Sequence, residues 1–150
     1  STHCISSAAS DVYKRQMTYI AVEGQNTMYD FWQGDQAART KSFETLKGEN
    51  YTLVFDGAEL GNSIGGGTFS GKATSAKVSG TWNANGENRK LTLDTKSTGT
   101  DADSYLGKAF VEGLKNAVRY GGDNKNLYIY YNEGSTTKFI SFAPQRNSGN

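Results

Sequence analysis

Short runs rich in Tyr, Phe, Thr and Val, separated by Asn, Gly and Asp, constrain the fold of this chain more than any other feature of its sequence. Such runs are typical of strands bounded by turns. Gly occurs 18 times and Pro once. We therefore predict a β-rich domain with six strands, at Thr18–Gly24, Asn50–Asp56, Ala76–Trp82, Arg89–Thr95, Asn126–Asn132 and Thr137–Ala143.

Two segments between these strands are predicted to be hairpin turns. Asn83–Asn88 contains Asn-Gly, which tolerates the positive φ of tight turns. Asn132–Thr136 is predicted to be the second hairpin turn, nearer the C-terminus. Within the second strand, alternation places Tyr51, Leu53 and Phe55 on one face. We expect that face to line the core.

One segment, Asp103–Gly122, is predicted to be an amphipathic helix. At 100° per residue its apolar residues share one side of the helix; they are Leu106, Phe110, Val111, Leu114, Ala117 and Val118. Gly107 lies within this stripe, where a missing side chain allows close packing on a sheet. Residues 27–48 receive no assignment, because Tyr29–Asn50 fits either a short helix or a long connection.

The ends of the helix also have recognisable signals. Asp103 or Ser104 is expected to cap its N-terminus by accepting backbone N–H bonds. Arg119 is placed in its last turn and Gly121–Gly122 after its end. The stripe is interpreted as core packing rather than as a cofactor site.

Residues 1–16 resemble a translated sequencing adapter. Ser6–Gln16, SSAASDVYKRQ, corresponds codon for codon to the transposon end and linker of a common short-read adapter. Ser1-Thr2 corresponds to the flow-cell primer and His3–Ile5 mainly to a sample barcode. Because such segments are excluded from fold reasoning, we treat residues 1–16 as a non-native tail with few contacts to the core, and residues 17–150 as one domain.

The tail contains the chain's one Cys and one His, Cys4 and His3, so residues 17–150 contain neither. Removing Asp11, Lys14 and Arg15 from the 16 basic and 15 acidic residues leaves 14 of each. This neutrality argues against a nucleic-acid partner, whose binder carries a basic surface. Apolar runs of a few residues predict no membrane span. Met17 need not be the true start, because a signal peptide or lipoprotein leader could have preceded it.

Two Gly-rich motifs are weak signals for chemistry. Gly61–Gly65 matches G-x-S-x-G, but Ser63 would need a histidine base. Gly65–Gly71 does not fit the P-loop pattern, because Ala73 rather than Ser or Thr follows Lys72. It does not fit the dinucleotide-binding pattern either, which would need Gly at Ser70. We predict a turn at Gly61–Gly67 and a flexible connection beyond it, with no catalytic residue.

The acidic segment before the helix is a poor metal site. Asp94–Tyr105 departs from the calcium-loop pattern at Lys96 and Tyr105. Asp101 and Asp103 are better explained as helix-capping residues, and zinc lacks Cys or His ligands. We predict no metal and no cofactor.

Aromatic residues in the C-terminal half form the candidate binding site. In one predicted strand, Leu127, Ile129 and Tyr131 point one way and Tyr128 and Tyr130 the other. If the first set faces the core, the second set is exposed for stacking on a sugar or a partner protein. The candidate ligand-binding residues are therefore Trp82, Tyr128 and Tyr130, although Tyr is also a good strand former.

Phe110–Pro144 resembles the closing section of the META domain, the HslJ-like family of small bacterial envelope proteins. Phe110, Leu114 and Tyr120 match that family's helix pattern approximately, and Tyr51–Gly57 and Gly65–Ala73 are similar to an upstream strand and turn. Gly67 and Thr68 replace the Cys and Asn of that turn. A small lipocalin-like barrel would give nearly the same pattern.

The resemblance implies a mainly β (α+β) fold, an antiparallel β-barrel or strongly curved sheet with one packed amphipathic helix. It also implies a secreted or envelope location and transfers no catalytic residue. Our leading hypothesis is a noncatalytic envelope module with a binding or structural role, with an envelope protein as one partner. The alternative is a β-barrel that binds a glycan or small ligand through Trp82, Tyr128 and Tyr130. A third hypothesis is a glycosidase using Asp56, Glu59 or Asp94.

Overall fold

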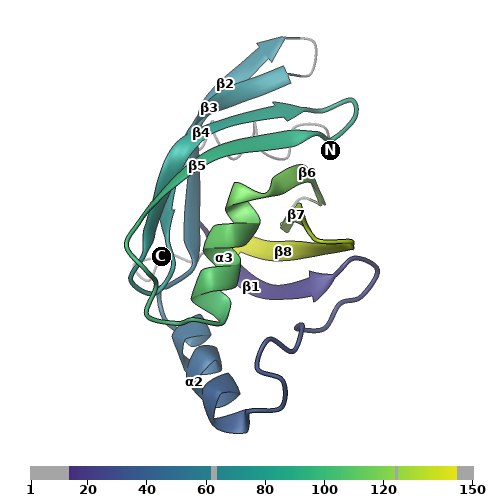
Figure 1. Ribbon diagram of the computed structural model, residues 1–150. Helices are drawn as coiled ribbons and strands as arrows, with labels where there is room; N and C mark the ends of the chain where they lie inside the picture. Colours follow the sequence, from purple (N-terminus) through teal and green to yellow (C-terminus); the bar gives the residue numbers. More distant parts are fainter. Residues whose placement is uncertain (1–13, 62–63, 124, 145–150) are drawn as a thin grey trace.

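The computed structural model describes residues 14–61, 64–123 and 125–144, and its main feature is an antiparallel sheet (Figure 1). The strands are β1 (Lys14–Val22), β2 (Thr52–Gly61), β3 (Ile64–Lys72), β4 (Lys77–Asn85), β5 (Leu91–Thr98), β6 (Ala117–Gly122), β7 (Leu127–Glu133) and β8 (Thr136–Pro144). Across the sheet they follow the order β5-β4-β3-β2-β1-β8-β7-β6. Each of the six predicted strands overlaps one of these, so the prediction of a mainly β domain is confirmed.

The sheet is strongly curved and does not close into a barrel. Its two edge strands, β5 and β6, approach each other at a bridge between Lys90 and Arg119. Beside it the Tyr120 amide donates a 2.9 Å hydrogen bond to the Arg89 carbonyl. This isolated bridge is not a continuous ladder between β5 and β6, so of the two predicted forms the curved sheet is the one observed.

Helix α3 (Leu106–Lys115) packs against the concave side of the sheet (Figure 1). Its Leu106, Phe110 and Leu114 side chains are fully buried. The Phe110 ring meets Tyr51 and Phe142 with centroid distances of 5.7 and 6.1 Å. Burying these large side chains is the main source of stability for a domain of this size.

The predicted helix over Asp103–Gly122 was too long. Helix α3 ends at Lys115, and Ala117–Gly122 forms β6, which pairs with β7. A short apolar segment fits both helical and strand periods, so long-range pairing decided the outcome. Val118 is therefore 39% exposed while Tyr120 is buried, and Arg119 is on a strand rather than at a helix end.

Most of strand β3 was predicted to be a turn and a flexible connection, and that prediction was wrong for Ile64–Gly71. The strand is rich in glycine because neighbouring backbones come very close to it. A Cβ atom added at Gly67 would lie 2.0 Å from the Asp56 carbonyl oxygen, and one added at Gly71 would lie 2.2 Å from that of Thr52. Glycine in a strand marks such close approaches at sharp bends of a sheet.

Strand β1 begins within the segment assigned to the adapter. Lys14–Gln16 pair with β2 on one side, and Arg15 and Gln16 pair with β8 on the other. The prediction of a peripheral tail is therefore wrong for residues 14–16, while residues 1–13 lie outside the described part. Ladder hydrogen bonds come from the main chain, so an unselected sequence can still complete a sheet. Arg15 shares the inner face with its partner Leu53 and is 4% exposed.

A second helix, α2 (Gln36–Lys47), lies in the region that received no assignment. Asp35 caps it by accepting a 3.1 Å hydrogen bond from the Ala38 amide. Ser42 is its one buried residue, and its hydroxyl accepts a 2.9 Å bond from Trp32 Nε1. The fold thus has a second, loosely packed helix beside the single packed helix that was predicted.

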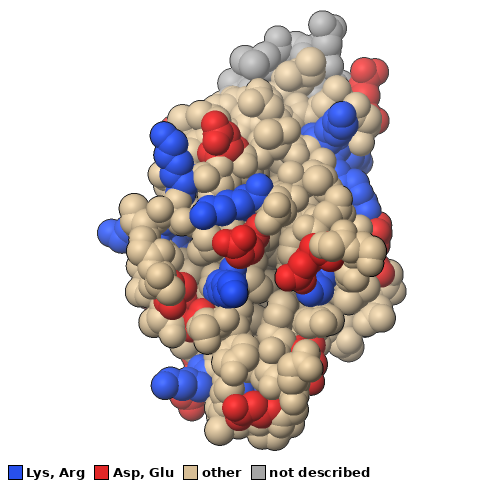
Figure 2. Space-filling model, viewed as in Figure 1, with Lys and Arg blue, Asp and Glu red and all other residues tan. Residues whose placement is uncertain are grey.

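The surface charges are mixed. On the face shown in Figure 2, Lys and Arg side chains are interspersed with Asp and Glu. The whole chain has a formal net charge of +1. No large field of one sign covers that face, in keeping with the balanced composition.

Candidate functional site

The outer face of strands β1, β8, β7 and β6 has two rows of side chains that run across the sheet. Directly paired residues of antiparallel strands share a face, so the pairing defines the rows. The first row is Tyr19, Ser141, Tyr128 and Gly121. The second row is Ala21, Phe139, Tyr130 and Arg119. We refer to these eight residues as the outer platform.

Phe139 is the centre of the outer platform. Its ring centroid lies 5.8 Å from that of Tyr19, 5.3 Å from that of Tyr128 and 5.4 Å from that of Tyr130. Phe139 is only 6% exposed although it is on the outer face, because these three half-buried tyrosines surround it. The result is an aromatic surface whose rings support one another.

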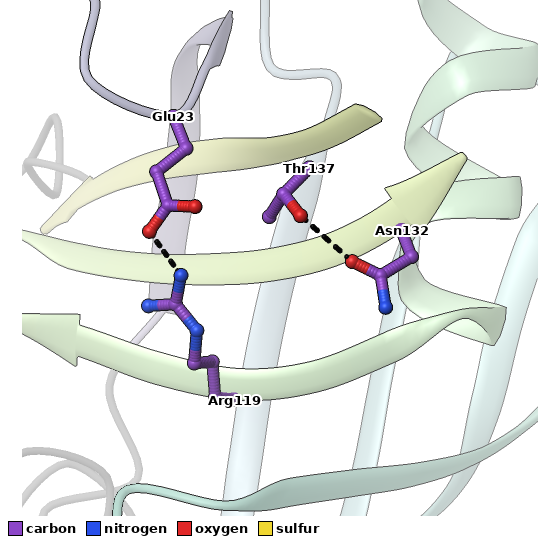
Figure 3. A network of polar contacts seen from close by, with 4 residues as sticks. All are labelled: Glu23, Arg119, Asn132 and Thr137. Atoms are coloured by element: carbon purple, nitrogen blue, oxygen red, sulfur yellow. Dashed lines mark hydrogen bonds and ion pairs between the residues drawn. The ribbon is translucent and has the colours of Figure 1, made fainter. Parts of the chain in front are cut away.

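Polar side chains border the outer platform on one side (Figure 3). Arg119 of β6 forms an ion pair with Glu23, which follows β1. Next to it the Thr137 hydroxyl donates a 2.9 Å hydrogen bond to Asn132 Oδ1. A guanidinium, a carboxylate and an amide therefore lie beside the rings, and all three are planar groups that can bind hydroxyls.

The Tyr128 phenol is neutral at ordinary pH. Partial burial is the main reason why its pKa is raised, and the neighbouring Tyr19, Asp123 and Tyr130 add to the effect. A neutral phenol keeps its proton for donation to a ligand.

The structure brings together two of the three predicted ligand-binding residues. Tyr128 and Tyr130 are on the outer platform, as the alternation predicted. Trp82 is not there, because it is on the inner face of β4 and has no exposed surface. Its Nε1 donates a 3.1 Å hydrogen bond to the Asp56 carbonyl, and its ring packs on Phe55.

Tyr19 and Arg119 were missed. The predicted first strand contained Tyr19, but only pairing with β8 shows that it lies beside Tyr128. The sequence predicts Arg119 on the helix, so it does not indicate that Arg119 lies beside Tyr130 and Glu23 on the sheet. Strand β1 also has an irregularity between Met17 and Tyr19, which shifts its alternation.

A second feature is a cleft of about 310 Å³ between α2 and the loop before α3. Its wall includes Ala38, Lys41, Thr45, Ala102, Asp103 and Tyr105. Two residues of this wall bind the buried Tyr51: Thr45 Oγ1 and Tyr51 Oη share a hydrogen bond of 2.9 Å, and Tyr51 Oη lies 3.4 Å from Asp103 Oδ2. These polar groups already bind one another, which leaves the cleft less to offer a ligand than the outer platform.

Burial is the largest cause that raises the pKa of the Tyr51 phenol well above its ordinary value. The hydrogen bond with Thr45 opposes this effect, whereas the carboxylates of Asp103 and Asp101 add to it. Tyr51 is therefore a neutral, structural phenol at physiological pH.

In the acidic segment before α3, the predicted capping role is confirmed for Asp103 and wrong for Asp101, which accepts no hydrogen bond from the described residues of α3. Asp103 Oδ1 accepts hydrogen bonds of 2.7 and 3.0 Å from the amides of Tyr105 and Leu106. Within the described residues no group of acidic or His side chains has the arrangement of a metal site.

Asp101 joins this segment to the turn between β3 and β4. Its carboxylate accepts bonds from Thr74 Oγ1 at 2.5 Å and from the amides of Ser75 and Ala76 at 2.8 Å. The Asp103 amide donates a fourth bond of 3.1 Å. Burial alone would raise the pKa of this carboxyl, but the four hydrogen bonds outweigh burial and lower it.

Two of the three carboxylates considered for a glycosidase, Asp56 and Asp94, are too far apart to form a catalytic pair. Asp56 and Asp94 are at the two ends of a row that passes through Thr68 and Thr81. Three strand spacings separate them, roughly 14 Å, whereas glycosidase pairs lie about 5–9.5 Å apart. Both side chains are exposed on the convex side, and that of Glu59 lies outside the described part.

Comparison with known proteins identifies the family. The model of DUF4847, a domain of unknown function, matches residues 13–144. The chain belongs to the DUF4847 family. The resemblance to the META domain is therefore corrected, and the envelope location that it implied loses its support. The shared features, a helix followed by two aromatic strands, are too common among small β-rich domains to identify one family.

A solved structure is similar to the DUF4847 chain along most of its length. It is the crystal structure of a DUF4847 family protein from Bacteroides vulgatus ATCC 8482. The two chains are 20% identical, the match covers 91% of this chain and 95% of that one, and the TM-score is 0.63. At this identity the likeness shows a common fold. Curated proteins gave no match. No helix in the described part of the chain is long and apolar enough to cross a membrane.

Proposed function

We propose that this DUF4847 chain is a noncatalytic binding domain that holds a saccharide on its outer platform. The observation that carries the proposal is the placement of three half-buried tyrosines around Phe139, next to the planar polar groups of Arg119 and Glu23. Tyrosine rings offer an apolar face to the C–H side of a sugar and a hydroxyl at their edge.

The bordering polar groups suit the rest of a sugar. Each sugar hydroxyl is both a donor and an acceptor, and the polar border offers both kinds of partner. Arg119 donates, Glu23 accepts, and Asn132 does both.

The absence of catalysis is part of the proposal. Residues 17–150 contain no Cys or His that would serve as nucleophile or base. Asp56 and Asp94 are separated by more than a glycosidase pair requires. We therefore expect binding without turnover of the bound saccharide.

A glycan array followed by titration calorimetry tests the proposal with the full chain. Tyr128→Ala should weaken binding of an array hit about five- to tenfold, since an aromatic contact contributes about 1 kcal/mol. Tyr105→Ala, in the cleft beside α2, is the matched control and should bind like the unaltered chain. Circular dichroism checks that both variants fold.

Two results would contradict the proposal. One is the absence of binding to any saccharide on the array. The other is loss of binding in Tyr105→Ala but not in Tyr128→Ala, which would place the ligand in the cleft.

A further inference from the structure

The end of the outer platform nearest β6 presents a cation rather than a bare ring. The Arg119 guanidinium carbon lies 3.9 Å from the centroid of the Tyr130 ring, so the guanidinium covers one face of that ring. The ring also leans across Gly121, where an added Cβ would meet Tyr130 Cε1 at 3.5 Å. A ligand that reaches this end of the outer platform therefore meets the guanidinium of Arg119.

The present partner of that guanidinium is easy to exchange. Glu23 follows the last residue of β1, and its side chain is 47% exposed, against 38% for Arg119. In Figure 3 the Arg119 side chain extends from β6 toward Glu23, and the pair bridges the two strands between them, β7 and β8. Solvent screens an exposed pair of this kind, so it contributes little to stability. Cation–π contact with Tyr130 holds the guanidinium in place when the carboxylate leaves.

Nearby charged groups do not have the same role. Lys138 of β8 forms an ion pair with Glu133, and its Nζ lies 3.9 Å from the centroid of the Tyr29 ring. Lys138 is 4% exposed, and its partner Tyr131 belongs to the inner face. Lys125 is in the turn between β6 and β7, and its side chain is exposed.

We propose that the outer platform selects anionic saccharides, and that Glu23 occupies the position of the ligand's anion in the free protein. The inference rests on the proposed function and names its ligand class. The anion is a sugar carboxylate or a sulfate ester. Arg119 binds either one through its fork of N–H donors, while the tyrosines contact the sugar ring.

A matched pair of probes tests the carboxylate. Oligogalacturonate and its fully methyl-esterified form have the same sugars and differ in charge. We expect calorimetry to show at least tenfold tighter binding of the acid form. A sulfated galactan oligosaccharide and its desulfated form make the second pair, and a preference in one pair alone identifies which anion is bound.

Three variants assign the preference to residues. Arg119→Gln should bring the affinities for acid and ester within about twofold of each other. Glu23→Gln should raise the ratio of acid to ester affinity severalfold, because the internal competitor of the anion is removed while the Gln amide oxygen can still accept a hydrogen bond from a sugar hydroxyl. Lys125→Gln is the control for non-specific attraction and should change neither. Thermal unfolding checks the fold of each variant.

Several results would overturn the inference. One is equal binding of the charged and neutral forms in both pairs, and another is a preference for the acid that survives Arg119→Gln. The others are weaker acid binding, relative to the ester, in Glu23→Gln and a loss of acid preference in Lys125→Gln as large as that in Arg119→Gln. If the neutral forms bind and Tyr128→Ala weakens them, the proposed function stands while the anionic ligand does not. If no probe and no array saccharide binds, both proposals fail.

Discussion

Replacing Gly107 with alanine should destabilise the protein, although alanine is the better helix former. Gly107 is a buried residue in the first turn of α3. A Cβ atom there would lie 1.7 Å from Asp101 Oδ2 and 2.4 Å from its Cγ. The Asp101 carboxylate cannot move aside freely, because hydrogen bonds from Thr74, Ser75, Ala76 and Asp103 fix it. The contact must therefore break some of those bonds.

The size of the effect follows from two opposing terms. Gly→Ala within a helix stabilises by about 1 kcal/mol. Displacing Oδ2 breaks its bonds with Thr74 Oγ1 and the Asp103 amide, and bonds to a charged group contribute about 1.5 kcal/mol each at the low end of their range. The net loss in the free energy of unfolding is about 2 kcal/mol. For a chain of this length that corresponds to a fall of roughly 4–8 °C in Tm.

A double-mutant cycle separates this cause from a general intolerance of alanine. Guanidinium unfolding followed by circular dichroism gives the free energies for Gly107→Ala, Asp101→Ala and the double variant. With the carboxylate gone, the remaining contact is with the residue 101 Cβ at 3.0 Å, and the added methyl should cost close to nothing. We expect a coupling energy of about 2 kcal/mol. Stabilisation by Gly107→Ala alone, or an equal loss in both backgrounds, would refute the reasoning.

Two further predictions concern Tyr51 and β3. Burial raises the pKa of Tyr51 above its unfolded value of about 10. The neutral phenol therefore contributes its full stability below pH 10, and this contribution is lost as the pH rises from there through the folded pKa. The stability advantage of the unaltered chain over Tyr51→Phe should shrink above pH 10 in urea titrations, and a constant difference up to pH 11.5 would contradict this. Gly67→Ala should lower the free energy of unfolding by about 1–3 kcal/mol through its clash with the Asp56 carbonyl. Ser70→Ala, an exposed position of the same strand, should change it by less than about 0.5 kcal/mol, and similar losses at both positions would argue against the close approach.

Predictions that depended on local alternation were confirmed. Leu127, Ile129 and Tyr131 face the core, and Tyr128 and Tyr130 face outward. Asp103 accepts the first amide bonds of α3, as its position before an apolar stripe indicated. Side-chain direction in a strand and the donors at a helix start are fixed within a few residues, so the sequence contains that information.

Predictions that depended on partners distant in the sequence were incomplete. The glycines of β3 looked like a flexible connection because the close approach of β2 explains them only after the strands pair. Trp82 looked like a ligand-binding ring, but pairing with Gly67 places it over a glycine on the inner face, where its indole is buried.

Local residue patterns are enough to predict a β-rich domain with a buried amphipathic helix and two outward-facing tyrosines in one strand. Strand pairing was needed to show that Ala117–Gly122 extends the sheet and that Lys14 already belongs to it. The tertiary structure also placed Tyr19 beside Tyr128 and Arg119 against Tyr130 and Glu23. The physical reason is that periodicity sets the direction of a side chain locally, whereas strand register between residues about 100 positions apart sets its neighbours.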